Sequence, residues 1–180
     1  RAYFGDLTAD MVPAMVEAVE TTDADMPKQI ILELVPRMMD RDRAGAFAAM
    51  LDSRYLVFRQ LVIDEYVRLK DAGLRQAAAE SVRRHLGSAE WPDRRHAVMN
   101  AGLLPEAERM AALARAAEDP QVWVRAEAVR ELGRVRTPEA LALIERVRGA
   151  TDHEELRFVC RCALAGVEEP GRLADLVCAN

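Results

Sequence analysis

Five basic residues recur at almost constant spacing along the chain, and their side chains could bind phosphates or pair with carboxylates. In chain order they are Lys28, Arg59, Arg94, Arg125 and Arg157. The intervals between them are 31, 35, 31 and 32 residues. A basic side chain at each position can donate hydrogen bonds to phosphate, carboxylate or backbone oxygens. The spacing therefore indicates either a basic stripe for nucleic acid or a structural contact that repeats.

Charge counts favour the structural contact. Five helices are expected to carry the recurring residues: Pro27–Met38, Arg54–Lys70, Pro92–Ala101, Val122–Val135 and Glu154–Ala165. Together they hold 13 basic and 8 acidic residues, and without the five recurring residues the numbers are 8 and 8. The whole chain has a formal net charge of −5. A surface without a basic excess neutralises phosphates poorly, so the sequence argues against a nucleic-acid partner.

The cysteines and histidines form no pattern that is typical of a metal site or a catalytic group. The three cysteines are Cys160, Cys162 and Cys178, and Cys160 and Cys162 point apart if they lie on one helix. Zinc-ligand spacings, phosphate-binding glycine motifs and a nucleophile with a partner histidine are all missing from the sequence. We therefore expect no metal, no cofactor and no enzymatic activity. An odd number of cysteines without a framework spacing favours a reducing compartment, here the cytoplasm.

The chain lacks any apolar run of about 18 residues, so no membrane span is expected. It begins at Arg1 and not at Met, which predicts that it was excised from a longer, multidomain protein. No linker or low-complexity segment divides it. We expect a single repeat domain over residues 1–180.

Helical periodicity extends over almost the whole chain, with proline at first-turn positions and glycine just after helix ends. The connecting segments are short, so successive helices should lie antiparallel. A period near 32 residues predicts an all-α fold, an α-solenoid of about five antiparallel helix pairs in a right-handed superhelix. Each pair should have an outer A helix and an inner B helix that carries the recurring basic residue.

The most complete copy of the repeat is D-P-Q-V-W-V-R-A-E-A-V-R-E-L-G, Asp119–Gly133, and similar copies are Ser88–Gly102 and Asp152–Gly166. These segments resemble the HEAT repeat, particularly the short bacterial variety found in phycobilin lyases. The resemblance is good over residues 87–167 and weaker, though in phase, over residues 8–70. It implies that acidic and basic side chains of adjacent repeats bond to one another as a ladder.

The ladder that the resemblance implies consists of Lys28, Arg59, Arg94, Asp119, Arg125, Asp152 and Arg157. Within one repeat, we expect Asp119 to cap the B helix, Leu132 to fill the core and Gly133 to mark the helix end. The first two copies depart from the pattern, because Lys28 replaces arginine and Asp52 lies seven residues before Arg59. The ladder should be irregular there.

A second set of positions, one, five and nine residues after each recurring basic residue, lies on one helix face and should line the concave surface. With the two tryptophans at the starts of B helices, the candidate partner-binding residues are Trp91, Arg95, Met99, Trp123, Arg130, Arg134 and Phe158. A solvated face without a partner is the alternative for the row. Packing between repeats is the alternative for the tryptophans.

We therefore hypothesise a non-enzymatic scaffold module that binds a protein or peptide segment on its concave B-helix face. Two alternatives come from resemblance. Some HEAT-like proteins are alkylpurine DNA glycosylases, but these need a strongly basic concave face. A phycobilin lyase-like subunit is the other, and no catalytic residue can be carried over from those enzymes to this chain.

Overall fold

A computed structural model describes residues 11–21, 50–51, 53, 56, 58–60, 63–64 and 72–166. The chain divides into two units, Arg1–Ser81 and Val82–Asn180, and each is described by itself. Lys28 and most of the first two expected repeats lie outside the described residues. The single domain expected over residues 1–180 stays a prediction.

The N-terminal unit contains α1 (Val12–Thr21) and most of α5 (Ala72–His85). Its described apolar core includes Met50, Leu51 and Phe58, none of which is more than 2% exposed. The Ser81 hydroxyl donates a hydrogen bond of 2.9 Å to the Leu51 carbonyl. This bond joins α5 to residues 30 positions earlier in the chain.

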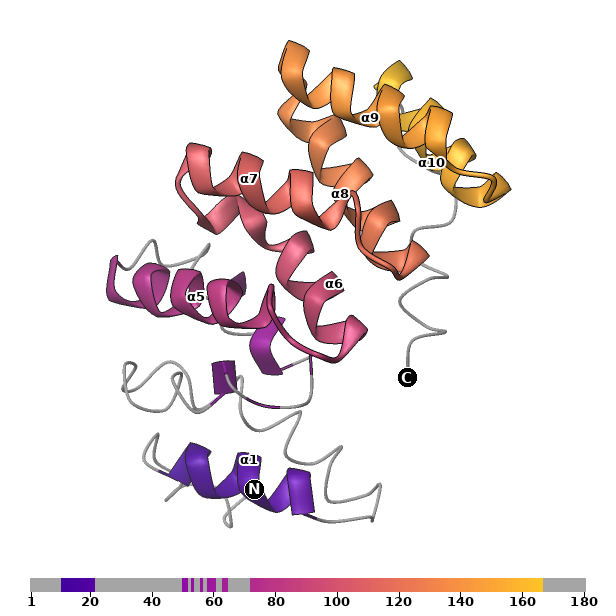
Figure 1. Cartoon of the computed structure of the whole chain (residues 1–180). Helices are drawn as coiled ribbons and strands as arrows, with labels where there is room; N and C mark the ends of the chain where they lie inside the picture. Colours follow the sequence, from indigo (N-terminus) through magenta and orange to yellow (C-terminus); the bar gives the residue numbers. More distant parts are fainter. Residues whose placement is uncertain are drawn as a thin grey trace. The chain divides into compact units, whose positions relative to one another are not determined.

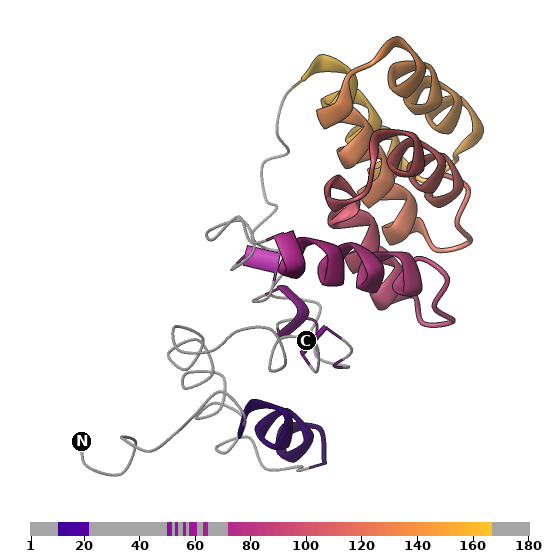
Figure 2. The same cartoon turned by 90° about the vertical axis from the view of Figure 1, so that its left-hand side faces the viewer.

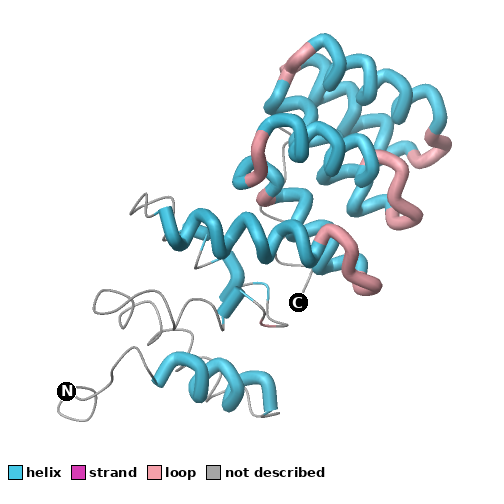
Figure 3. The backbone as a smooth tube through the Cα atoms, turned by 60° about the vertical axis from the view of Figure 1, so that its left-hand side comes forward, coloured by secondary structure: helices cyan, strands magenta, loops and turns pink. Residues whose placement is uncertain are grey.

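In the C-terminal unit, every element of the described residues is helical, as the sequence predicted. The α-helices that follow α5 are α6 (Trp91–Met99), α7 (Glu106–Ala116), α8 (Val122–Val135), α9 (Pro138–Ala150) and α10 (Glu154–Ala165). A single 3₁₀ turn, η2 (Ala101–Leu103), follows α6. Short loops join these helices (Figure 3). The arrangement is an α-solenoid.

The helices of this unit form two layers (Figures 1 and 2). The B helices α6, α8 and α10 are neighbours in one layer, with α8 between the other two. In the other layer, α7 contacts α6 and α8, and α9 contacts α8 and α10. Each A helix therefore covers the junction of two B helices, which is how a solenoid buries its apolar faces.

Local sequence explains where several helices begin and end. Thr137 is the N-cap of α9, its hydroxyl accepts a hydrogen bond of 3.2 Å from the Ala140 N–H, and Pro138 follows at the first helical position. Gly166 ends α10 with a φ of +72°, a conformation that glycine adopts without strain. The expectation for Gly133 was wrong, because α8 continues through it to Val135.

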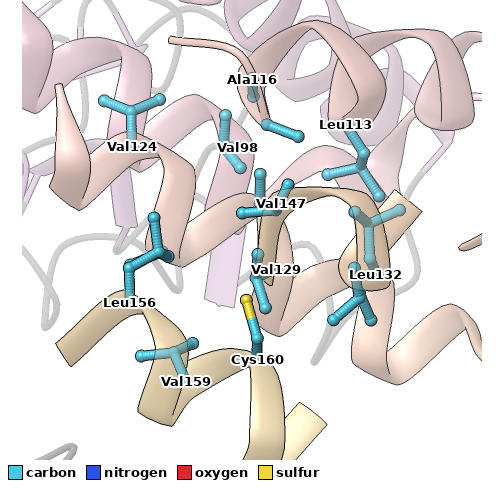
Figure 4. Close-up of a cluster of buried hydrophobic side chains, with 14 of the residues drawn as sticks. Val98, Leu113, Ala116, Val124, Val129, Leu132, Val147, Leu156, Val159 and Cys160 are labelled. Carbon is cyan, nitrogen blue, oxygen red and sulfur yellow. The ribbon is translucent and has the colours of Figure 1, made fainter. Parts of the chain in front are cut away.

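The core of this unit lies between the two layers and is built from small and branched side chains (Figure 4). Leu113 of α7, Leu132 of α8, Ile144 of α9 and Cys160 of α10 are completely buried. Alanine occupies many of the remaining core positions, which allows the helix backbones to approach closely. This core holds the B helices in a fixed register, and that register positions the site described next.

Candidate functional site

The recurring arginines share one backbone contact. Each guanidinium donates a hydrogen bond to the carbonyl oxygen six residues earlier. The pairs are Arg59 with Ser53, Arg94 with Ser88 at 3.0 Å, Arg125 with Asp119 at 2.7 Å, and Arg157 with Thr151 at 2.8 Å. Arg94 and Arg125 also donate to the next carbonyl along. The arginine thus binds the loop that leads into its own B helix.

The residue six positions before the arginine also binds its loop through its side chain. Ser88 accepts a hydrogen bond from the Glu90 N–H at 3.2 Å, Asp119 from the Gln121 N–H at 2.9 Å, and Thr151 from the His153 N–H at 3.2 Å. Each donor belongs to the residue directly before a helix. Asp119 therefore stabilises the turn ahead of α8, and it does not cap the free N–H groups of that helix as expected.

One contact of the expected ladder joins adjacent repeats among the described residues. Arg94 of α6 binds Asp119 with two parallel hydrogen bonds, Nε to Oδ2 at 2.7 Å and Nη2 to Oδ1 at 2.9 Å. Burial opposes ionisation of Asp119, but the bonds from Arg94 and the Gln121 N–H prevail, so its pKa lies below the usual value. The hydrogen bond from Arg94 to this carboxylate in turn raises the pKa of the guanidinium.

Asp152 does not occupy the position in the ladder that the sequence predicted. Its side chain is fully exposed and accepts a hydrogen bond of 3.3 Å from Arg157 of its own repeat. The position equivalent to Asp119 belongs to Thr151, which is neutral. Among the described residues, Arg125 therefore makes only the bonds to its own loop carbonyls, Asp119 and Pro120, whereas Arg94 makes both these loop bonds and the bond to a carboxylate of the following repeat.

Two buried glutamates of α8 were missed by the sequence reasoning. The Glu127 and Glu131 side chains are only 3% and 4% exposed. Oε2 of Glu127 accepts from Nε of Arg95 on α6 and from Nη1 of Arg130 on α8, both at 3.3 Å. Its other oxygen, Oε1, is buried and has no hydrogen-bond partner in the described part of the chain.

Glu131 lies between two further arginines. Its Oε2 is 3.6 Å from Nη2 of Arg109 on α7, and its Oε1 pairs closely with Nη1 of Arg134 on α8. Nε of Arg109 is buried without a hydrogen-bond partner among the described residues. We call these six residues the arginine–glutamate network: Arg95, Arg109, Glu127, Arg130, Glu131 and Arg134. The network joins α6, α7 and α8.

The repeat register shows what signal could have revealed the network. Two and six residues after the recurring arginine, α8 carries Glu127 and Glu131, whereas α10 carries Val159 and Ala163. Val159 is buried, and Ala163 lies against Gly133 of α8. Acidic residues at positions that another repeat keeps apolar indicate a buried ionic contact. The sequence alone does not show which arginines pack against these glutamates, because Arg95 and Arg109 come from other helices.

The candidate partner-binding residues fall into three groups. Arg95 and Arg130 lie mostly buried at Glu127, with side chains 18% and 11% exposed, so they are not free surface cations. Trp91 and Met99 are partly buried, and Trp91 packs against the core. The other three, Trp123, Arg134 and Phe158, are exposed.

The two exposed aromatic residues lie on consecutive B helices. Trp123 of α8 is 38% exposed and Phe158 of α10 is 42% exposed. The Arg161 guanidinium lies 5.8 Å from the centre of the Phe158 ring, within the range of a cation–π contact. Phe158 has the register position of Ala126 in α8, which is only 4% exposed. The two aromatics are the large apolar side chains that this unit leaves accessible among its described residues.

Among the described residues, no three or more histidine, cysteine, aspartate or glutamate side chains lie together in a group that could hold a metal ion. Within the same part of the chain, no helix is long and apolar enough to cross a membrane.

Comparison with known proteins agrees with the repeat. Residues 79–165 match the family model for HEAT repeats, and this range extends from within α5 to the end of α10. No curated protein and no solved structure matched the chain. The matched region is thus HEAT-like.

Proposed function

We propose that this chain is a non-enzymatic interaction module that binds a segment of a protein partner on its B-helix layer. The observation that carries the proposal is the exposure of Trp123 and Phe158, 38% and 42%, on neighbouring B helices of a HEAT-like solenoid. Aromatic side chains are enriched where partners bind, because they bury much apolar area at little entropic cost. HEAT repeats commonly mediate contacts between proteins.

The charge of the B layer supports a protein partner over a nucleic acid. The helices α6, α8 and α10 contain seven arginines and five acidic residues, a difference of +2. Arg94 and Arg157 are also paired with Asp119 and Asp152 of the adjoining loops. Binding to a phosphate backbone depends on many uncompensated cations, which this layer lacks.

The proposal is tested by removing the aromatic side chains. The double variant Trp123→Ala, Phe158→Ala should lose captured partners by about tenfold or more, which is the scale of two moderate hot spots. The readout is quantitative mass spectrometry of proteins retained by the immobilised chain. Charge reversal at Arg130 is unsuitable, because it would place a second carboxylate beside buried Glu127.

The matched control is Glu118→Ala with Arg146→Ala. These side chains form an exposed ion pair at 3.3 Å, and Arg146 lies on an A helix. The control should retain its partners, and thermal unfolding should show that both variants are folded. Loss of partners in the control alone would place binding on the A-helix layer and refute the proposal.

We further propose that the protein acts in the cytoplasm. Cys160 and Cys162 are free thiols, and Cys160 is buried on α10 beside the core. A reducing compartment preserves such thiols. Trapping of free thiols in freshly lysed source cells should find both in the reduced form, and a disulfide at either would contradict this location.

A further inference from the structure

We infer that the protein segment bound by this module is acidic, and that Arg109 and Arg134 receive its carboxylates. This inference rests on the proposed function and specifies the chemistry of the partner. The two arginines come from different helices, α7 and α8, and contact opposite oxygens of Glu131. They are the most exposed cations of the arginine–glutamate network, with side chains 26% and 42% exposed.

The network contains more cations than anions. Its four guanidiniums surround two carboxylates, so the six residues carry a formal charge of +2. Both carboxylates are buried and cannot move away to follow a partner. A carboxylate that approaches from solvent would therefore meet Arg109 and Arg134, two fixed guanidiniums that share the single carboxylate of Glu131.

Arg109 has hydrogen-bonding capacity to spare. Its nearest carboxylate atom, Oε2 of Glu131, lies 3.6 Å away, which is beyond normal hydrogen-bond distance. Its Nε is buried with no hydrogen-bond partner among the described residues. A buried donor without an acceptor destabilises the unbound protein. An acceptor that allows the guanidinium to form its hydrogen bonds therefore binds more favourably.

Glu131 acts in this scheme as an internal competitor for the same two cations. It holds Arg109 and Arg134 near one another, and it also removes one charge from their combined field. Glu106 is exposed and lies three residues before Arg109 on α7. An acidic peptide fits this site better than a nucleic acid, because the two guanidiniums that flank Glu131 suit a pair of carboxylates.

The test compares variants of opposite effect in the full chain. The probe is a short fluorescent peptide of alternating glutamate and serine, and binding is followed by anisotropy. Arg109→Gln should weaken binding by about three- to fivefold, the scale of one partly exposed ion pair. Glu131→Gln should tighten binding by a similar factor, because the competing charge is removed while the side chain keeps its shape. A purely structural role for Glu131 cannot produce tighter binding.

The control pair makes the same chemical changes at an exposed ion pair elsewhere. Arg146→Gln and Glu118→Gln should each leave the affinity for the peptide unchanged, and urea unfolding reports whether Glu131→Gln remains folded. If Glu131→Gln unfolds, Arg109→Lys is measured instead. Lysine keeps the positive charge but lacks the paired N–H donors of the guanidinium, so this variant should bind the peptide with an affinity between those of the wild type and Arg109→Gln. The inference is supported if Glu131→Gln binds the peptide more tightly than the wild type. It is also supported if the affinity falls in the order Arg, Lys, Gln at position 109.

The outcomes also separate this inference from the proposed function. Equal binding of the glutamate peptide and its glutamine counterpart, or tighter binding of an oligothymidylate, would overturn the acidic-peptide assignment. Partner capture that depends on Trp123 and Phe158 but not on Arg109 would overturn it too, while leaving the interaction module intact. Failure of the aromatic variants to affect capture would instead remove the proposed function itself.

Discussion

At the scale of single residues, the recurring arginine has two separable tasks. Every described copy binds the carbonyl oxygen six residues earlier, which fixes the loop before the B helix. Arg94 also makes a bidentate bond to a carboxylate of the next repeat, Asp119, whereas the equivalent residue for Arg125 is the neutral Thr151. The two tasks predict different energetic costs for the same substitution in different repeats.

Arg125→Ala should lower the free energy of unfolding by about 1–2 kcal/mol, because two loop carbonyls lose their donor. Arg94→Ala should cost about 2–4 kcal/mol, since it also leaves a mostly buried carboxylate without its charged partner. Urea unfolding of the two variants provides the comparison. Equal midpoints would mean that the bond between Arg94 and Asp119 contributes nothing beyond the loop contact.

The lowered pKa of Asp119 predicts how stability depends on pH. The unfolded carboxyl titrates near pH ~3.9, and the folded one titrates lower. The ionised carboxylate therefore contributes its full stabilisation above pH ~5 and loses it as the pH falls through the folded pKa. Unfolding free energies of the wild type and of Asp119→Asn should converge on acidification. A constant difference down to the folded pKa would contradict the assignment.

At the scale of elements, α8 and α10 approach more closely than side chains normally permit. A Cβ atom added at Gly133 would lie 2.9 Å from Cβ of Ala163 and 3.2 Å from its Cα. Glycine is unfavourable inside a helix, yet at this position it allows the two B helices to pack. The α8–α10 junction is thus tight and apolar, whereas the α6–α8 junction contains the arginine–glutamate network.

Gly133→Ala should destabilise the protein by about 1–3 kcal/mol, because the added methyl group forces α8 and α10 apart. Gly149→Ala in α9 is the matched control, since nothing lies within 4 Å of its added Cβ. The control should stabilise by up to about 1 kcal/mol through helix propensity alone. Thermal unfolding measures both changes, and two stabilised variants would show that the junction adapts without cost.

At the scale of the whole molecule, the stability of a solenoid depends on contacts between neighbouring repeats and not on one central core. The structure supports this for the C-terminal unit, where α10 contacts α8 and α9. Cys160 offers a probe of the last described repeat, because it is completely buried and its burial raises the pKa of the thiol to about 11. At mildly alkaline pH it can react only after α10 opens.

Labelling of Cys160 should therefore report local opening of α10. In a background where Cys162 and Cys178 are serine, Leu156→Ala should speed alkylation by about tenfold or more, because it removes a buried contact of α10 itself. Leu113→Ala is an equally buried change on α7 and should speed it less. Equal acceleration would show that this part of the chain opens as one cooperative unit.

The sequence by itself determined the helical repeat. Helical periodicity and the spacing of the arginines predicted the bounds of α8 and α10 as Val122–Val135 and Glu154–Ala165, whereas the expectation that Gly133 ends α8 was wrong. The resemblance to the HEAT repeat brought Arg94 and Asp119 into one hypothesis, because it implies a ladder of acidic and basic side chains between adjacent repeats. These features depend on local chain geometry and on a residue pattern that recurs in each repeat.

The tertiary structure alone decided which charged residues are buried. Arg95 and Arg130 looked like surface cations in the sequence, and they became core partners of Glu127 once α6 and α8 packed side by side. Trp91 and Trp123 had similar sequence positions, yet only Trp123 is exposed. Burial depends on which neighbouring helix covers a position and how closely it approaches. That distance is set by contacts between residues about one repeat apart, which helical periodicity does not encode.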